Sequence, residues 1–415
     1  SIVRVGACAT PGIAWGVFVQ DSLAYVADRS GLTIVNASDP YNPWIVGTLT
    51  HPDAWAAGLF VRDTVAYLHQ GAVGIFSTVN VSDPSDPQII GWCEMPYCSG
   101  TDPRGIHVAD TFCYVARGQE GFVTINVARL DSPVVIDTFD TPGFAMDFCV
   151  QDTVMYIADR DSVQVVNIIN PVSPQRLGSC STPSSCYGIS VVDTVALVAC
   201  QSSMGTDGRV EIINVSAPAS PFIIDESLMN ADPYAVRSSG LYAYIAAADY
   251  WTDKRGLRRK VAGLRSPEGQ GSIADVEGGL RVVDVSDPGS SNLVATRDTP
   301  GDPRDLFVVD YLVYVADYDS LQVLRHVITG VEEQVSYDTQ EHVSTLMQNS
   351  PNPFVTTTSI QYSIATRSQV SLRIHDVAGR LVKVLVGRVQ NPGYYTVGWD
   401  GRDGLGREVM GGVYF

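Results

Sequence analysis

The sequence has few charged residues and no long apolar run. Asp, Glu, Lys and Arg make up 17% of its 415 residues. No stretch approaches the roughly 18–20 uninterrupted apolar residues that a membrane-spanning helix needs, so we expect no transmembrane segment. The opening residues, SIVRVGACATPG, lack the basic start and apolar core of a secretory signal peptide. Such an opening is typical of a chain whose export signal has been removed or was never included.

Motifs for catalysis and metal binding are also missing. The chain has no G-x-S-x-G, no H-E-x-x-H, no glycine-rich phosphate loop and no C-x-x-C pair, and its 6 histidines are scattered. We therefore expect no catalytic residue, no metal site and no organic cofactor. The stretches ADRDS (158–162) and ADYDS (316–320) offer carboxylates for a structural calcium ion, but they lack the spacing of an EF-hand loop. Turn formation also accounts for them.

The distribution of charge argues against one class of partner. The net charge is −18, yet residues 346–415 hold 7 Lys and Arg against 4 Asp and Glu, so residues 1–345 hold 20 against 41. Such an acidic body repels phosphate backbones. Nucleic acid is therefore not expected as a partner.

Glycine (37), proline (23) and tyrosine (19) are plentiful, which suits short strands joined by tight turns. An internal repeat organises them. Alignment on the aromatic residue of LAYVAD gives seven units, marked by Tyr25, Tyr67, Tyr114, Tyr156, Leu197, Tyr244 and Tyr314. The spacings are 41–47 residues except the last, which is 70 because unit six carries an insertion at about 251–277.

Each unit predicts four short strands. In the first unit they are WGVFV (15–19), LAYVAD (23–28), GLTIVN (31–36) and WIVGTL (44–49). Little strict polar–apolar alternation is present, as in sheets covered on both faces, and stacked four-stranded units of about 40 residues are typical of a β-propeller. A solenoid would need distinct polar caps, which we do not find. We therefore predict an all-β fold with a seven-bladed β-propeller.

The ends of the repeat predict how the ring closes. Unit seven stops one strand short, and IVRVGAC (2–8) matches the missing outer strand, so we expect the N-terminal strand to close blade seven. The turns NASDPYNP (36–43), NVSDPSDP (80–87) and NVSAPASP (214–221) recur between the third and outer strands. We expect the Asn side chain and the prolines to set this turn.

These motifs resemble a known repeat family. LTIVNASDPYNP (32–43), GLRVVDVSDP (279–288) and YVAD look like the repeats of LVIVD-repeat β-propellers, and the resemblance covers about residues 1–329. It implies the fold and little about activity, because one fold hosts many functions.

The C-terminal part loses this repeat. Residues 330–345 read as an acidic linker, and 346–415 combine alternating strands with the turns DVAGR (376–380) and DGRDGLG (400–406), which predicts a small β-sandwich. With PNPF (351–354), WDGRD (399–403) and GVYF (412–415), this region resembles the immunoglobulin-like C-terminal domain of type IX secretion cargo, related to that of flagellar hook-capping proteins. The resemblance implies a partner, the outer-membrane secretion machinery, and a secreted or cell-surface protein. A purely structural sandwich is the alternative.

An extracellular address makes the eight cysteines candidates for disulfides. Cys93 with Cys98, and Cys180 with Cys186, occupy the same place in their units, so each pair could staple the loop that leaves the outer strand. The connectivity of four others stays open: Cys8, Cys113, Cys149 and Cys200.

The mouth of the propeller channel is the expected binding site. Loops between units gather there, and the alignment places aromatic rings among Arg and Asp residues, a mixture that suits a sugar or a peptide. The candidates are Trp15, Trp55, Asp102, Arg104, Phe144, Tyr187, Tyr234, Asp302 and Arg304. The alternative is that TDPRG (101–105) and GDPRD (301–305) are Asp–Arg clips that only fix their loops.

The insertion of unit six is rich in basic residues. It should project from the same face as a basic flap that docks on the acidic ring, grips an anionic glycan or holds a neighbouring subunit; a solvated loop is the alternative. Its members are Lys254, Arg255, Arg258, Arg259, Lys260 and Arg265.

The first hairpin turn of four units reads DSL or DTV. These triplets resemble the Asp-Ser/Thr-apolar sites at which some bacteria of this kind attach O-glycans, although hairpin formation also explains them. The candidate hydroxyls are Ser22, Thr64, Thr153 and Thr194.

Together these features favour a secreted or surface-displayed, non-catalytic propeller that binds a glycan, a peptide or a copy of itself, and thereby assembles or captures. The alternative is an extracellular polysaccharide hydrolase or lyase with the channel mouth as its active site.

Overall fold

The computed structural model describes residues 1–50, 56–71, 74–96, 103–201, 208–229, 231–248, 278–328, 345–346, 358–364, 368–376, 380–390, 393–404, 407, 409, 412 and 414. The chain divides into two compact units, Ser1–Thr329 and Gly330–Phe415. All the secondary-structure elements of the described residues are β-strands. None of these residues belongs to a helix long and apolar enough to cross a membrane.

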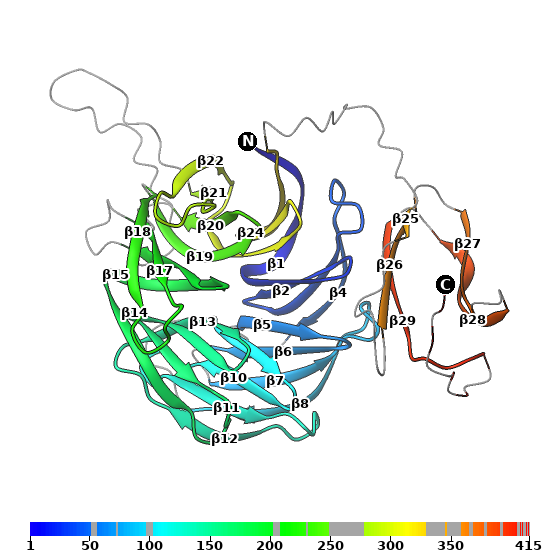
Figure 1. Ribbon diagram of the computed structural model, residues 1–415, viewed down its shortest axis with the longest axis horizontal. Helices are drawn as coiled ribbons and strands as arrows, with labels where there is room; N and C mark the ends of the chain where they lie inside the picture. The colour runs from blue at the N-terminus through cyan, green and yellow to red at the C-terminus, as the bar shows by residue number, and fades with distance from the viewer. Residues whose placement is uncertain are drawn as a thin grey trace. The chain divides into compact units, whose positions relative to one another are not determined.

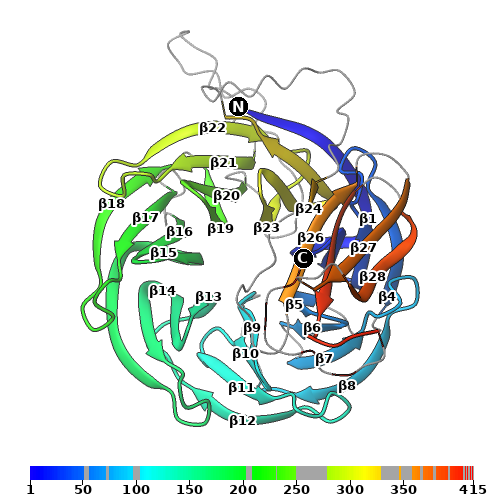
Figure 2. The ribbon, with the colours of Figure 1, turned by 45° about the vertical axis from the view of Figure 1, so that its right-hand side comes forward.

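The first unit is a β-propeller whose sheets surround a central axis (Figures 1 and 2). Three of its sheets have four strands each, in the order of the chain. They are β5 (Ala56–Arg62), β6 (Val65–Gln70), β7 (Ile75–Asn80) and β8 (Gln88–Glu94); β9 (Ile106–Ala109), β10 (Phe112–Ala116), β11 (Phe122–Asn126) and β12 (Val134–Phe139); β19 (Asp232–Ser239), β20 (Tyr242–Ala248), β21 (Gly279–Asp284) and β22 (Asn292–Asp298).

The other two sheets of this unit have six strands each. One runs β23 (Pro303–Val309), β24 (Leu312–His326), β1 (Ile2–Gln20), β2 (Leu23–Asp28), β3 (Gly31–Asn36) and β4 (Trp44–Thr50). The other runs β13 (Ala145–Gln151), β14 (Val154–Asn167), β15 (Gln175–Val192), β16 (Val195–Gln201), β17 (Arg209–Asn214) and β18 (Phe222–Leu228).

The prediction of seven blades is therefore wrong: the described strands hydrogen-bond into a five-bladed propeller. The reason lies in four long strands, β1, β14, β15 and β24, which continue through positions where the sequence predicts breaks. β14 pairs with β13 through Val154–Asp159 and with β15 through residues 160–167. The links inside β14 and β24 are tight turns, with Arg160 and Tyr318 at φ angles of 58° and 60°, and strand pairing resumes directly after them. Each six-stranded sheet therefore takes up the strands of two repeat units.

The N-terminal segment closes the ring. Residues 2–9 of β1 pair antiparallel with residues 320–326 of β24, while residues 14–20 of the same strand pair with β2. Ser1 and Val327 exchange two further hydrogen bonds at the end of this pairing. Both strands would otherwise present unpaired N–H and C=O groups along an edge.

The recurring Asn sets the turn before each outer strand, as predicted. Asn36 Oδ1 accepts hydrogen bonds from the backbone N–H and the hydroxyl of Ser38, at 2.9 and 2.7 Å. The same side-chain-to-backbone bond recurs at Asn80, Asn126, Asn167, Asn214 and, with Asp in place of Asn, at Asp284. Each is an Asx turn, in which the side chain stands in for a backbone acceptor.

The core of the propeller lies between neighbouring sheets. One cluster packs Tyr25, Leu32 and Ile34 of the first repeat unit against Leu59 and Leu68 of the second. Similar clusters recur around the ring, while outer strands such as β4 and β22 are largely exposed. The second and third strands of each unit are covered on both faces, so both sets of side chains are buried. This explains why polar and apolar residues do not alternate strictly in the sequence.

The second unit contains two small sheets. One is three-stranded, with β25 (Thr345–Leu346), β26 (Thr358–Ile364) and β29 (Gly393–Trp399), and the other pairs β27 (Ser368–His375) with β28 (Leu381–Gln390). Ile360, Ile374 and Trp399 form a common core between the two. The prediction of an immunoglobulin-like sandwich is wrong for the described residues, because these five strands fall short of the two larger sheets of that fold.

Candidate functional site at the channel mouth

The inner strands crowd the propeller axis. A Cβ atom placed on Gly16 would lie 2.9 Å from the carbonyl oxygen of Ala57, and one on Gly188 would lie 2.7 Å from that of Tyr234. Each glycine therefore touches the backbone of the next inner strand. Gly58 meets the carbonyl oxygen of Arg104 in the same way, at 2.5 Å. This crowding explains why small residues occupy the second inner-strand position, and it fixes the side chains just before them around the mouth.

Arg104 crosses the axis. Its guanidinium donates hydrogen bonds to the carbonyl oxygens of Tyr187, Tyr234 and Arg304, which come from three other inner strands. Burial lowers the pKa of Arg104, while Asp305 and Asp147 oppose that shift. One predicted mouth residue therefore joins three others, but through their backbones, and it closes the channel at this level.

A second cation closes the axis at another level. Arg237 lies 3.4 Å from an oxygen of Asp147 and 3.5 Å from an oxygen of Asp305. Asp305 also accepts a hydrogen bond from the backbone N–H of Val17 at 3.1 Å. Burial alone would lower the pKa of Arg237, but Asp147 and Asp305 outweigh burial and raise it.

These three charged residues are absent from the predicted site. The alignment carried a signal for two of them, since Asp147 and Asp305 stand where four other units have Gly. A carboxylate fits that crowded position because the guanidinium of Arg237, on another inner strand, reaches it. Arg237 itself occupies the position of Phe18, Phe60 and Phe307, and no pattern within its own unit marks it.

Arg304 organises the predicted aromatic residues. Its guanidinium lies 4.3 Å from the ring centroid of Tyr234 and 5.1 Å from that of Trp15, within the range of cation–π attraction. Arg29 lies 4.9 Å from the Trp15 ring, so two cations contact this indole. Tyr187 packs edge-on against Tyr234, with ring centroids 5.8 Å apart. Trp15, Tyr187 and Tyr234 nevertheless stay partly exposed.

Polar atoms without partners gather around Arg304. Its Nε is buried without a hydrogen-bond partner, and so is Oδ1 of Asp232. Burial raises the pKa of Asp232 to about 6, although Arg304 opposes the shift. Asp302 is buried and lies 3.8 Å from Arg304, a loose version of the Asp–Arg clip. One hydrogen-bond donor, Nε of Arg304, and one acceptor, Oδ1 of Asp232, therefore have no partner at the mouth.

The remaining predicted mouth residues are less connected. Phe144 contacts the guanidinium of Arg160, which lies 4.6 Å from its ring centroid. Trp55 and Asp102 lie outside the described residues, as does the whole basic flap at 251–277.

The Asp of the repeated YVAD motif has a structural role. Asp159 accepts hydrogen bonds from the Thr141 hydroxyl and the Gly143 N–H, at 2.6 and 2.9 Å. Asp317 does the same with Thr299 and Gly301, at 2.8 Å each. Burial raises the pKa of both carboxyls to about 6, against the effect of these hydrogen bonds.

These residues belong to the two stretches considered for calcium. Among the described residues, no group of three or more His, Cys, Asp or Glu side chains is placed to hold a metal ion. The carboxyls of Asp159 and Asp317 instead bind the Thr-Pro-Gly loop of their own repeat unit.

The structure does not pair Cys180 with Cys186, and the predicted pair of Cys93 with Cys98 falls partly outside the described residues. Cys93, Cys180 and Cys186 are free thiols, and Cys98 lies outside the described residues. The prediction joined Cys180 to Cys186, but Cys186 Sγ lies 2.7 Å from Cys200 Sγ instead. Local spacing is misleading here because Cys186 faces the strand paired with its own, β16.

The candidate glycosylation residues lie in exposed turns. Ser22, Thr64, Thr153 and Thr194 are exposed, and each follows an Asp with a positive φ of 52–56°. Asp tolerates this left-handed conformation better than most residues, so turn geometry accounts for the Asp of the motif. Glycan attachment stays a prediction.

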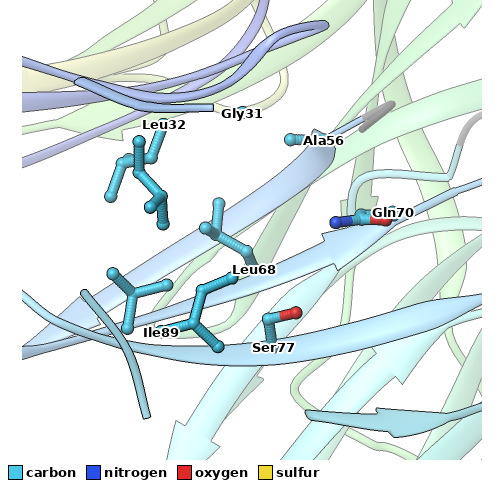
Figure 3. A pocket seen from close by; sticks show the side chains of 9 residues that line it. Gly31, Leu32, Ala56, Leu68, Gln70, Ser77 and Ile89 are labelled. Carbon is cyan, nitrogen blue, oxygen red and sulfur yellow. The ribbon is translucent and has the colours of Figure 1, made fainter. Parts of the chain in front are cut away.

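A small pocket lies between β3 and β4 on one side and β5 to β8 on the other (Figure 3). Its lining is mostly apolar and includes Leu32, Leu68 and Ile89, with Gln70 at one end. It is a packing gap between two neighbouring sheets and contains no pair of groups suited to catalysis.

Replacement of Arg104 by Ala should destabilise the propeller. Three partly buried carbonyl groups would lose a charged donor, which we expect to lower the free energy of unfolding by about 2–4 kcal/mol. Chemical denaturation monitored by tryptophan fluorescence measures this change. The exposed Arg129, which pairs with its neighbour Asp131, is the matched control, and its Ala variant should unfold like the wild type. An Arg104→Ala variant of unchanged stability would contradict the axial role.

The free energy of unfolding should depend on pH through the titration of the Asp317 carboxyl group. Its folded pKa of about 6 exceeds the usual value, so the folded state holds the extra proton and its stability falls as pH rises from about 4 to 6. Asp317→Asn removes this titration. Its free energy of unfolding should therefore rise relative to that of the wild type over this pH range, by on the order of 2 kcal/mol. Denaturation at a series of pH values tests this, and a constant difference would contradict the shift.

Comparisons with known proteins agree with the fold. The LVIVD repeat family matches residues 11–50, 142–182 and 272–299, which belong to repeat units one, four and six. No curated protein matches the chain.

Several solved structures share the architecture at low sequence identity. BamB from Moraxella catarrhalis is 12% identical with a TM-score of 0.51, and the alignment covers 79% of this chain and 100% of that one. The WD40 β-propeller domain of Doa1 is 10% identical with a TM-score of 0.55, covering 79% and 97%. Virginiamycin B lyase from Staphylococcus aureus is 10% identical with a TM-score of 0.54, covering 79% and 99%. Identities this low show only the fold: the chain is a β-propeller that carries LVIVD repeats.

Proposed function

We propose that the protein is a non-catalytic binding or scaffold protein whose channel mouth holds an extended polypeptide segment. One observation carries this proposal. At the mouth, aromatic rings stay partly exposed beside buried polar atoms that have no partner, while the axis beneath them is closed.

The closed axis favours a ligand that lies across the surface. Arg104 is bound to three inner strands, and Arg237 bridges Asp305, on one of these strands, and Asp147 on a fourth. Opening the channel would leave those carbonyls and charges without partners, at a cost of several kcal/mol. A ligand therefore meets the mouth from outside and does not penetrate.

The chemistry of the mouth suits a peptide better than a sugar. Sugar stacking needs a bare aromatic face, yet guanidinium groups contact the rings of Trp15 and Tyr234. A peptide backbone alternates N–H donors and C=O acceptors, which match the unpartnered Oδ1 of Asp232 and Nε of Arg304. Partly exposed aromatic and Arg side chains are also the residues that dominate protein interfaces.

The enzyme alternative has one feature in its favour, the raised pKa of Asp232. A glycosidase needs a second carboxylate at a set distance, one of the pair protonated. The other carboxylate beside Arg304, that of Asp302, is buried against the guanidinium. This arrangement supports binding more than hydrolysis.

The test compares two mouth variants with a matched surface variant. Purified wild-type protein is used to select ligands from a displayed random-peptide library and, in parallel, from a glycan array. Trp15→Ala and Tyr234→Ala should each weaken binding of the selected peptides by about tenfold or more. Trp44→Ala, on the exposed outer strand β4, should leave it unchanged.

Three results would overturn the proposal. They are binding of glycans but no peptides, equal binding by all three variants, and turnover of a polysaccharide that is lost in Asp232→Asn.

We further propose that residues 346–415 direct type IX secretion and that the protein works outside the cell or on its surface. The order of PNPF, DVAGR, WDGRD and GVYF supports this. The full chain and a chain ending at residue 329, each behind the same export signal, can be expressed in a bacterium with this machinery. Only the full chain should reach the medium or cell surface; equal release of both would refute a sorting role.

A further inference from the structure

Two buried cysteines face each other across β15 and β16. Cys186 and Cys200 are directly opposite in the antiparallel pairing, and neither side chain is exposed. Their Sγ atoms are 2.7 Å apart, closer than thiols that merely pack together and a short movement from the roughly 2.05 Å of a disulfide.

The same position holds a different link in other repeat units. Asp159 is opposite Ala145, Asp317 is opposite Pro303, and Cys200 is opposite Cys186 in the equivalent strand pair. Asp159 and Asp317 each tie the end of the second strand to the loop that enters the inner strand. A thiol at position 200 does not reproduce the two strong hydrogen bonds that an Asp carboxylate accepts there.

We propose that Cys186 and Cys200 form a disulfide that replaces this Asp link in the fifth repeat unit. One other part of the link has changed with it, since Ser replaces the Gly, while the Thr is retained. Thr182 and Ser184 stand where unit four has Thr141 and Gly143, and the Thr182 hydroxyl is 3.1 Å from Cys186 Sγ. Cys186 stands where units one, two and four have Ala and units three, six and seven have Pro.

The chemistry is thiol–disulfide exchange with a small disulfide oxidant. The thiolate of one cysteine attacks the oxidant, forms a mixed disulfide and releases one thiol. The second cysteine loses its proton and attacks the mixed disulfide, which forms the Sγ–Sγ bond and releases the second thiol. Two electrons and two protons pass from the cysteines to the oxidant.

Burial indicates when the bond forms. Desolvation raises the pKa of Cys200 well above its usual value, so the folded protein offers almost no thiolate at this residue. Oxidation therefore accompanies folding, while β15 and β16 are still accessible. Cys180 lies in an earlier part of β15 opposite Val163, and its Sγ contacts the Ser181 carbonyl oxygen, so it is not the expected partner.

Refolding under redox control tests the proposal. The full chain is unfolded with reductant, refolded in a buffer of reduced and oxidised glutathione, trapped with an alkylating reagent and digested without reduction. The expected product is a cross-linked peptide that contains Cys186 and Cys200. Reduction should then lower the midpoint of thermal unfolding by several degrees.

Single substitutions provide the controls. Cys180→Ser should still form the cross-link, and Cys200→Ser should not. Alkylation of both Cys186 and Cys200 in the refolded wild type would overturn the proposal, as would a peptide that joins Cys180 to Cys186. The wild-type digest decides the question even where a variant fails to fold.

Discussion

Close approach of the inner strands is the constraint on which the propeller depends. Gly16, Gly58 and Gly188 each lie against a carbonyl group of the next strand, so the strands meet the axis with no space for a Cβ. Asp147 and Asp305 take that position in two other units, and Arg237, from another inner strand, meets both carboxylates. The same crowding lets one guanidinium, that of Arg104, reach three other strands. Packing at the axis thus decides where charged side chains can lie. The charged and aromatic side chains that are not used in these axial contacts surround the mouth.

Much of the fold could be predicted from the sequence because the same pattern of strands and turns recurs in each repeat unit. The second and third strands, the Asx turns and the pairing of the N-terminal segment follow from patterns that recur in most units. The number of sheets did not follow. Whether two neighbouring strands fuse depends on links such as residues 159–162, which are too short to interrupt the strand, and residue types do not reveal that.

The site was predictable only in part, for a related reason. Alignment placed Trp15, Arg104, Tyr187, Tyr234 and Arg304 around one mouth, because equivalent positions of a ring converge. It did not reveal that Arg104 donates hydrogen bonds to backbone carbonyl groups of three other units. Every residue has such a group, so residue types do not show which ones accept a hydrogen bond. Cys186 was assigned to Cys180 by proximity along the chain, whereas antiparallel pairing brings it to Cys200. Contacts across the ring or across a hairpin are the ones that local patterns miss.

The pairing of β1 with β24 also bears on how the protein folds. These partners are separated by more than three hundred residues, so the ring stays open until nearly all of the first unit has been made. A contact of such sequence separation forms slowly, since a very long loop must close first. During synthesis residues 2–9 therefore keep unpaired backbone N–H and C=O groups until β24 has been made. Until the ring closes, these groups are open to pairing with other chains.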